Sequence, residues 1–214
     1  PRQKMINLMY VVLMAMLALN ISSEVLNGFS IVEESLNRTT ANSSKENEVL
    51  YGNFAEQMKK NPQKVKEWFE KATAVKRMSD SLYNFAQALK VQIVREADGK
   101  DGNIYNIKSK DNLEAASHVM LAPGTGQGKK LYDAINNFRE RILKMVPDQH
   151  QRDIIESNLT TKVPKNANTL GKNWQEYMFE DMPVAGAVTL LSKLQSDVRY
   201  AEGEVLHTLV ANID

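Results

Sequence analysis

The sequence predicts an all-α protein in which a single N-terminal transmembrane helix continues into an elongated helical bundle. Three observations lead to this fold class. The chain opens with two cations and a long apolar run, later segments repeat apolar residues every three or four positions, and glycine and proline are scarce, at 10 and 6 of 214 residues. No segment alternates apolar and polar residues strongly enough to predict a sheet.

The N-terminal run is the basis for the transmembrane helix. Arg2 and Lys4 stand directly before the apolar residues Met5 to Ile21, and Asn7 and Tyr10 are the polar positions in the first half of that run. As a helix the run would be about 25 Å long, near the lower limit for spanning a bilayer. Its large side chains occur all round the helix rather than on one stripe, which suits lipid or another wholly apolar environment.

Two alternatives stay open for this run, namely a cleavable secretory signal and a buried core helix. A secretory signal ends in a small-x-small cleavage site, whereas residues 15–18 read Ala-Met-Leu-Ala. We therefore expect a transmembrane helix over residues 1–22 and a helical-bundle domain over residues 23–214. By the positive-inside rule Arg2 and Lys4 mark the cytoplasmic side. The bundle would then lie in the periplasm of a single-pass bacterial inner-membrane protein.

Composition excludes several classes of function. Lys and Arg number 27 against 26 Asp and Glu, so the net charge of +1 offers no basic excess for nucleic acid. The chain has no cysteine, which excludes disulfides, thiolate metal sites and cysteine nucleophiles. Its three histidines are far apart in sequence. We therefore expect no metal, no cofactor and no enzymatic activity.

Helical spacing continues beyond the apolar run. Apolar residues at Val25, Phe29, Val32 and Leu36 predict that the membrane helix runs on to about Thr39. The polar stretch TTANSSKEN at residues 39–47 then predicts a turn or a helix break. A second helix is expected from Glu46 to Lys60.

Asn61 and Pro62 give a helix-start signal, because asparagine can cap a helix and proline fits its first position. The helix that follows, from Val65 to about Arg95, is the clearest amphipathic segment. Its apolar residues recur in steps of three and four at Val65, Phe69, Ala72, Val75, Met78, Leu82, Phe85, Leu89 and Ile93.

The second half of the chain predicts shorter helices. Residues 97–111 form a turn-rich connection and residues 122–128 a flexible loop, and the expected helices are Asn112–Met120, Lys129–Val146, Asp148–Leu159 and Pro183–Val210. Residues 160–182 are expected to be irregular, with Trp174, Tyr177 and Phe179 either closing one end of the bundle or contacting a partner. The last helix meets no stop signal, so we expect further domains beyond it.

Two segments imitate ligand-binding motifs. GTGQGKK at residues 124–130 resembles a phosphate loop, but Pro123 and Lys130 stand where that motif needs Gly and Ser or Thr. ADGKDGN at residues 97–103 suggests a calcium loop, but its acidic residues Asp98 and Asp101 are out of register. Both segments are therefore interpreted as connections.

The candidate functional residues lie at the membrane end. Arg2 and Lys4 are either a topology signal with snorkelling side chains or interacting charges within the membrane. A charge drawn to the bilayer centre costs about 2.5–3.5 kcal/mol, so it would need a carboxylate partner. The N-terminal run contains no acidic residue, and the partner would belong to another polypeptide. Asn7 and Tyr10, three residues apart on one helix face, could hydrogen-bond across helices.

PRQKMINLMYVVLMAMLALNISSEVLNGF, at the start of the chain, resembles the N-terminus of the GldM/PorM family of the Bacteroidetes type IX secretion and gliding-motility machinery. A second block, NANTLGKNWQEYMFEDMPVAGAVTLLSKLQSDV at residues 166–198, resembles the first periplasmic domain of that family. Members of that family carry further β-rich periplasmic domains, in agreement with the expectation that domains follow the last helix.

The resemblance implies a homodimer whose membrane helices sit inside a ring of GldL/PorL-like subunits in the lipid bilayer. That complex would be a motor powered by the proton motive force, with later domains reaching ring proteins at the outer membrane. Arg2 and Tyr10 match the membrane arginine and tyrosine of the family, and the arginine is expected to pair with a glutamate of a ring helix. The alternative functions are a passive membrane-anchored scaffold or sensor module and, third, a periplasmic enzyme.

Overall fold

The computed structural model describes the backbone of residues 2–19 and 21–213 and the side chains of residues 2–11 and 21–213. Within these residues every regular element is a helix, and the all-α prediction is confirmed. The helices are α1 Arg2–Leu19, α2 Ser23–Lys60, α3 Pro62–Asp98, α4 Ala115–Leu121, α5 Gly128–Leu143, α6 Gln149–Asn158, α7 Trp174–Phe179 and α8 Val184–Ile213.

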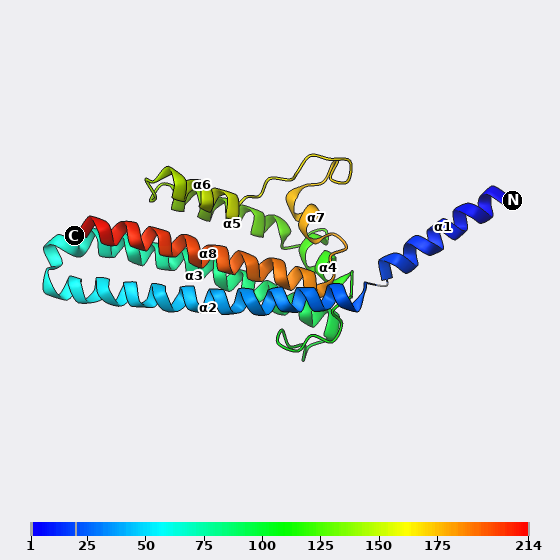
Figure 1. Ribbon diagram of the computed structural model, residues 1–214, viewed down its shortest axis with the longest axis horizontal. Coiled ribbons are helices and arrows are strands. Elements are labelled where there is room, and N and C mark those ends of the chain that lie inside the picture. Colours follow the sequence, from blue (N-terminus) through cyan, green and yellow to red (C-terminus); the bar gives the residue numbers. More distant parts are fainter. Residues whose placement is uncertain (1, 20, 214) are drawn as a thin grey trace.

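Three long helices form the body of the molecule (Figure 1). Helices α2 and α3 make an antiparallel hairpin, and α8 packs along both of them, running in the direction of α2. At 1.5 Å per residue α2 is about 57 Å long and α8 about 45 Å long. The result is a rod rather than a globule.

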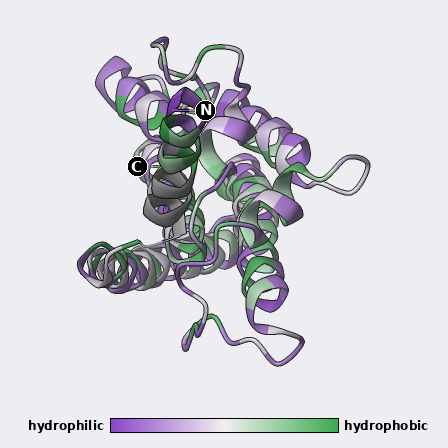
Figure 2. Ribbon diagram, turned by 90° about the vertical axis from the view of Figure 1, so that its right-hand side faces the viewer, coloured by the Kyte–Doolittle hydropathy of each residue, from purple (hydrophilic) through white to green (hydrophobic). Residues whose placement is uncertain are grey.

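The core of this rod is built from the apolar positions that the helical spacing predicts. Fully buried residues of α3 and α8 face one another, among them Val75, Leu89, Ile93, Val188, Leu191, Val198 and Val205. Each such side chain contributes about 1.5–3 kcal/mol by leaving water. Figure 2, an end-on view, shows green and purple positions interleaved along the helices, which is the pattern of amphipathic helices.

Helix α2 corrects two predictions. The expected break at residues 39–47 is wrong, because α2 continues without interruption from Ser23 to Lys60. Thr40 and Asn47, within the polar stretch, are buried against the bundle. Packing against two neighbouring helices outweighs the weak helix propensity of Ser, Thr and Asn.

The second correction concerns the junction with the N-terminal helix. The prediction of one helix running through to Thr39 is wrong, because α1 ends at Leu19 and α2 begins separately at Ser23. The hydroxyl of Ser22 accepts a hydrogen bond from the backbone N–H of Val25 at 3.2 Å and so caps α2. Residue 20 lies outside the described residues.

The α2–α3 hairpin confirms the start signal. The side chain of Asn61 accepts a hydrogen bond from the N–H of Lys64 at 3.3 Å, and Pro62 occupies the first turn of α3. Helix α3 then runs to Asp98, three residues beyond the predicted end. Gly99 follows with a φ of 94°, a conformation that favours glycine.

Helices α4 to α7 lie along one side of the rod (Figure 1). The prediction that residues 160–182 are irregular is wrong in part, because α7 forms there behind a capping box between Asn173 and Glu176. Trp174 and Phe179 are buried, with their rings 6.0 Å apart in an edge-to-face arrangement. These two rings therefore belong to the core, whereas Tyr177 is exposed.

The two segments that resemble ligand-binding motifs, residues 124–130 and 97–103, have structural roles. A Cβ at Gly126 or Gly128 would come within 2.7 Å of the Met120 carbonyl oxygen, so these glycines allow α4 and α5 to approach closely. The Asp98 carboxylate accepts hydrogen bonds from the N–H groups of Lys108 and Ser109 at 2.8 and 2.9 Å. It closes the connection between α3 and α4.

Helix α1 projects away from the rod (Figure 1). The described apolar side chains Met5, Leu8, Met9 and Val11 are exposed. A search of the described residues finds no helix whose length and apolar character suffice to cross a membrane.

Candidate functional site

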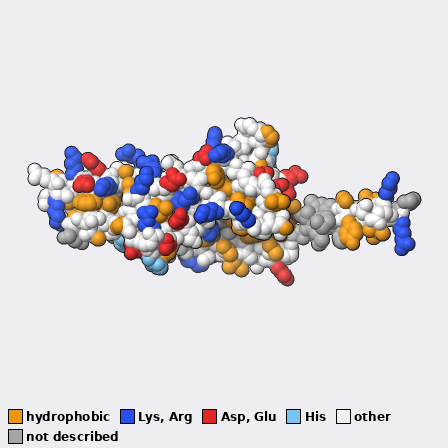
Figure 3. Space-filling view, turned by 90° about the horizontal axis from the view of Figure 1, so that it is seen from above, with side chains coloured by type: hydrophobic (Ala, Val, Ile, Leu, Met, Phe, Trp, Pro, Cys, Tyr) orange, Lys and Arg blue, Asp and Glu red, His pale blue; other side chains and the backbone are white. Residues whose placement is uncertain are grey.

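The four sequence-predicted site residues, Arg2, Lys4, Asn7 and Tyr10, all lie on α1 with exposed side chains. The amide of Gln3 donates a hydrogen bond to the side-chain oxygen of Asn7 at 3.3 Å. Tyr10 is 64% exposed. Lys and Arg side chains stand out at the far end of this helix in Figure 3.

The helix places three of these four residues, Lys4, Asn7 and Tyr10, along one side, because each is three residues from the next. At about 100° per residue, Asn7 and Tyr10 are about 60° apart around the helix axis, whereas Arg2 and Lys4 are about 160° apart. The two cations therefore point to nearly opposite sides of α1. A single partner helix on that side can meet Lys4, Asn7 and Tyr10, whereas Arg2 faces a different partner.

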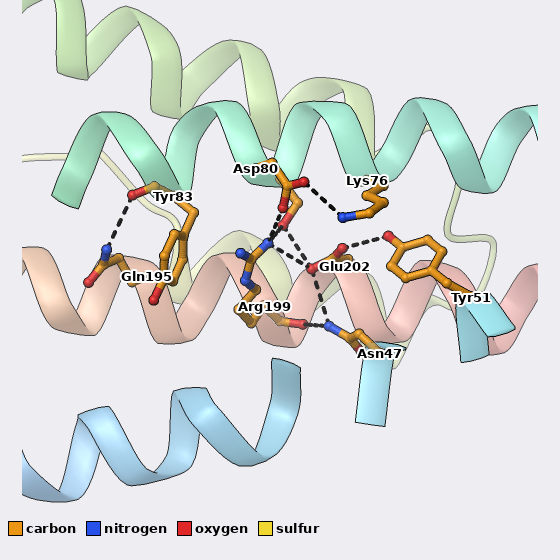
Figure 4. Close-up of polar contacts among 9 residues, drawn as sticks. Asn47, Tyr51, Lys76, Asp80, Tyr83, Gln195, Arg199 and Glu202 are labelled. Carbon is orange, nitrogen blue, oxygen red and sulfur yellow. Dashed lines mark hydrogen bonds and ion pairs between the residues drawn. The ribbon is translucent and has the colours of Figure 1, made fainter. Parts of the chain in front are cut away.

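A second candidate site, which the sequence analysis missed, lies inside the rod and centres on Glu202 (Figure 4). Glu202, on α8, is 2% exposed. Its carboxylate accepts hydrogen bonds from Ser79 Oγ at 2.8 Å, Asn47 Nδ2 at 3.2 Å and the Tyr51 hydroxyl at 2.5 Å. Because these partners belong to α2 and α3, one carboxylate joins all three long helices.

Arg199 compensates the buried charge. Its Nη1 lies 3.3 Å from Glu202 Oε1 and 2.9 Å from Asp80 Oδ1, and its guanidinium stands 4.1 Å from the centroid of the Tyr83 ring. Burial alone would raise the pKa of Asp80, but hydrogen bonds from Lys76 and Arg199 outweigh it and hold that pKa below its ordinary value of 3.8. We call Asn47, Tyr51, Ser79, Arg199 and Glu202 the Glu202 layer.

A second polar layer surrounds Lys90, which is also buried. Its Nζ donates hydrogen bonds to Ser192 Oγ at 2.8 Å and to Gln195 Oε1 at 2.9 Å, and lies 3.8 Å from Glu33 Oε1. Ser192 in turn donates to Glu33 at 2.7 Å. Burial lowers the pKa of Lys90, and the negative charge of Glu33 offsets part of that shift. Glu33, Lys90, Ser192 and Gln195 form the Lys90 layer, which again joins α2, α3 and α8.

These layers can hold the helices in one register. Gln195 and Glu202 are seven residues apart, which is about 10 Å along α8. If one long helix slid by a turn, a buried charge in each layer would lose its partner, at a cost of about 3–5 kcal/mol each. Most of these polar side chains are buried, and their hydrogen bonds run between the three long helices. The described residues also contain no group of three His, Cys, Asp or Glu placed to bind a metal.

A signal for the layers was present in the sequence. The core positions of α8 recur in steps of three and four, at Val188, Leu191, Gln195, Val198, Glu202 and Val205. Two of these positions, Gln195 and Glu202, hold polar residues. A charge at such a position predicts a buried partner. It does not say where that partner lies, because the partners of Glu202 on α2 and α3 are more than a hundred residues away in the sequence.

A comparison with protein-family models matches residues 24–212 to the GldM N-terminal domain. The chain belongs to the GldM family. This confirms the resemblance drawn from the sequence and makes the chain a component of the gliding-motility and type IX secretion machinery. A search of curated proteins found no match to this chain.

The match to the GldM N-terminal domain covers the rod and both polar layers. Arg2, Lys4, Asn7 and Tyr10 lie before its first residue. Their expected role therefore depends on the N-terminal resemblance and on the chemistry of α1, and it is treated below as a proposal.

Proposed function

We propose that this chain is an inner-membrane subunit of a motor, powered by the proton motive force, that drives type IX protein secretion and gliding. In this proposal α1 lies in the bilayer with its N-terminus in the cytoplasm, and the rod stands in the periplasm and transmits motion across it. The family supports the setting, and the apolar run after two cations supports the membrane position.

The observation that carries the proposal is the construction of the rod. A part that transmits motion must not bend, fray or slip, and α2 is one continuous helix of 38 residues held to α3 and α8 along its length. The two polar layers fix the axial register of the three long helices, which purely apolar packing specifies only weakly. A passive anchor would need neither the length nor the register.

Coupling to the membrane would occur through α1. We propose that two copies of the chain form a homodimer and that a ring of GldL/PorL-like membrane subunits surrounds their α1 helices. Arg2 would pair with a glutamate of a ring helix, and the pair would form and break as that glutamate loses and gains a proton. Lys4, Asn7 and Tyr10 would offer the further polar contacts, while later domains would contact ring proteins at the outer membrane.

Substitution of Arg2 tests this coupling. We expect Arg2→Ala to abolish secretion and gliding in cells, because the ring carboxylate would lose its partner in a low-dielectric environment. Arg2→Lys keeps the charge but loses the bidentate geometry, so partial activity is expected. Lys4→Ala removes the cation on the other side of α1, and it should reduce secretion and gliding less than Arg2→Ala. Full activity of both Arg2 variants would contradict the proposed coupling.

Composition of the purified complex separates the motor from its alternative. Affinity purification from membranes followed by mass spectrometry of the intact complex should recover two copies of this chain with a ring of small two-helix subunits. Recovery of a dimer without a ring, or of a signalling partner, would instead favour a membrane-anchored periplasmic scaffold or sensor module.

A further inference from the structure

The loop between α6 and α7 carries the most exposed large apolar side chain of the rod. Leu170 is 88% exposed. Residues 160–173, here called the 160–173 loop, contain Lys162, Lys165 and Lys172 and no acidic residue. Lys172 lies 3.4 Å from Glu180, so the positive charge free for other contacts belongs to Lys162 and Lys165, which are exposed.

Contacts within the loop hold the side chain of Leu170 toward solvent. Thr169 beside it is buried, and its hydroxyl donates to the carbonyl of Pro164 and accepts a hydrogen bond from the N–H of Asn166 at 3.1 Å. Gly171 follows with a φ of 79°, which reverses the chain directly after Leu170. Internal hydrogen bonds therefore fix a turn whose apolar side chain faces solvent.

The position of the loop suggests what it meets. It arches along the side of the rod to the end where α2 begins, which is the end from which α1 leaves (Figure 1). Lys and Arg side chains lie beside hydrophobic ones on the face seen in Figure 3. The connection between α3 and α4 lies at the same end, and it carries Tyr105, which is 82% exposed.

We propose that the 160–173 loop contacts the anionic surface of the bilayer, with Leu170 entering the interface and Lys162 and Lys165 facing lipid phosphates. The inference rests on the proposed membrane position of α1. An apolar tip flanked by cations is the combination that binds anionic interfaces, since burial of apolar area and electrostatic attraction to the lipids both favour binding. Tyrosine is also favoured at this depth, which suits Tyr105. The loop would give the rod a second attachment beside α1 and fix its tilt.

Depth-dependent fluorescence quenching can test the contact on the full chain. The chain has no cysteine, so single-cysteine variants take up one fluorophore each. The variants are Ala167→Cys in the loop, Leu8→Cys in α1, and Val49→Cys on α2, where the side chain is 65% exposed and about 39 Å from the start of α2. The labelled chains are reconstituted in vesicles of phosphatidylglycerol and phosphatidylcholine that contain a lipid-attached quencher.

We expect quenching at positions 167 and 8 and little at position 49. Each lysine near an anionic surface changes the contact equilibrium about fivefold, so Lys162→Glu with Lys165→Glu should reduce quenching at position 167 on the order of tenfold or more. Leu170→Asp should also reduce it, and so should vesicles of phosphatidylcholine alone. Position 8 should stay quenched in all of these cases.

Quenching at position 8 without quenching at position 167 would overturn the loop contact and leave the membrane position of α1 intact. Absence of quenching at position 8 would overturn that membrane position, and the loop contact with it. Equal quenching at positions 167 and 49 would mean that the rod lies flat on the membrane, which also contradicts the proposal.

Discussion

The carboxylate of Glu202 sits on α8 and accepts hydrogen bonds from side chains of α2 and α3. Its burial carries a desolvation cost that only complete hydrogen bonding and the nearby Arg199 can offset. Burial of Lys90 in the other layer carries a similar cost, which its hydrogen bonds to Ser192 and Gln195 and the nearby Glu33 offset. At the scale of single residues, therefore, the rod depends on a few polar groups whose partners all have to be present.

Glu202→Ala should strongly destabilise the rod. The change leaves Ser79, Asn47 and Arg199 without their shared acceptor in a dry environment, and we expect a loss of about 3–5 kcal/mol in the free energy of unfolding. Glu202→Gln keeps an acceptor oxygen and should lose less. Urea unfolding followed by circular dichroism gives the values, with Glu56→Ala on the exposed face of α2 as control. A Glu202→Ala variant as stable as the control would contradict a structural role for the layer.

Asp80 gives the rod a pH-dependent contribution in acid. The pKa of Asp80 in the folded chain lies below 3.8. Its stabilising effect is therefore complete above the pKa of the unfolded chain, and it is lost as the pH falls through the pKa of the folded chain. Asp80→Asn should therefore be about 1 kcal/mol less stable than the natural chain at neutral pH, because the pair is partly exposed. As the pH falls through the pKa of Asp80 in the folded chain, the difference should vanish. Urea unfolding at several pH values measures this, and a constant difference would contradict it.

Single-residue patterns predicted the core better than they predicted the layers. Leu82, Leu89 and Val198 recur at helical spacing and are buried, because the helical period alone decides which side of a helix they occupy. Glu202 and Lys90 occupy core positions for a reason that lies on other helices. A one-dimensional pattern cannot supply those partners, so neither layer was predicted.

Helix α2 shows at the scale of elements how tertiary packing overrides local preference. Its polar stretch at residues 39–47 has turn-forming composition but places Thr40 and Asn47 against the bundle. The starts of α3 and α6 were easier to predict, because Asn61 and Asp148 cap these helices with local contacts. A helix cap is determined by residues adjacent in the sequence, whereas the continuity of α2 depends on its packing against α8.

Two substitutions at Asn42, an exposed position in that stretch, test whether it is helical. Asn42→Ala should raise the free energy of unfolding by about 0.5 kcal/mol, since alanine is the better helix former. Asn42→Pro should lower it by about 3 kcal/mol or more through loss of a backbone hydrogen bond. Thermal or urea unfolding distinguishes the two. In a turn both changes would be nearly neutral, so tolerance of proline would count against a continuous α2.

For the whole molecule, the junction between α1 and α2 is the point where the proposed membrane helix and the rod meet. Ser22 caps the start of α2 there, and the rod beyond it is stabilised by its own core. Motion generated around α1 would therefore reach the rod through a short connection. In the proposed function the stiffness of that connection matters more than its sequence.

A flexible Gly-Ser-Gly-Ser insertion after Ile21 should uncouple the two parts. Such a linker behaves as a random coil and transmits little torque, so we expect secretion and gliding to fail while the stability of the rod and the recovery of the ring subunits are unchanged. An inserted Ala-rich segment of equal length is the matched control. Normal secretion with the flexible linker would contradict force transmission through this junction.

The parallel course of α2 and α8 has a mechanical consequence. Helix α2 begins at the end of the rod nearest α1, and α8 finishes at the opposite end (Figure 1). A pull between these two points loads the α2–α8 contact in shear, so all of its side-chain contacts resist at once, whereas an antiparallel pair pulled from one end would peel open turn by turn. The topology therefore suits a component under sustained tension as well as one that is turned.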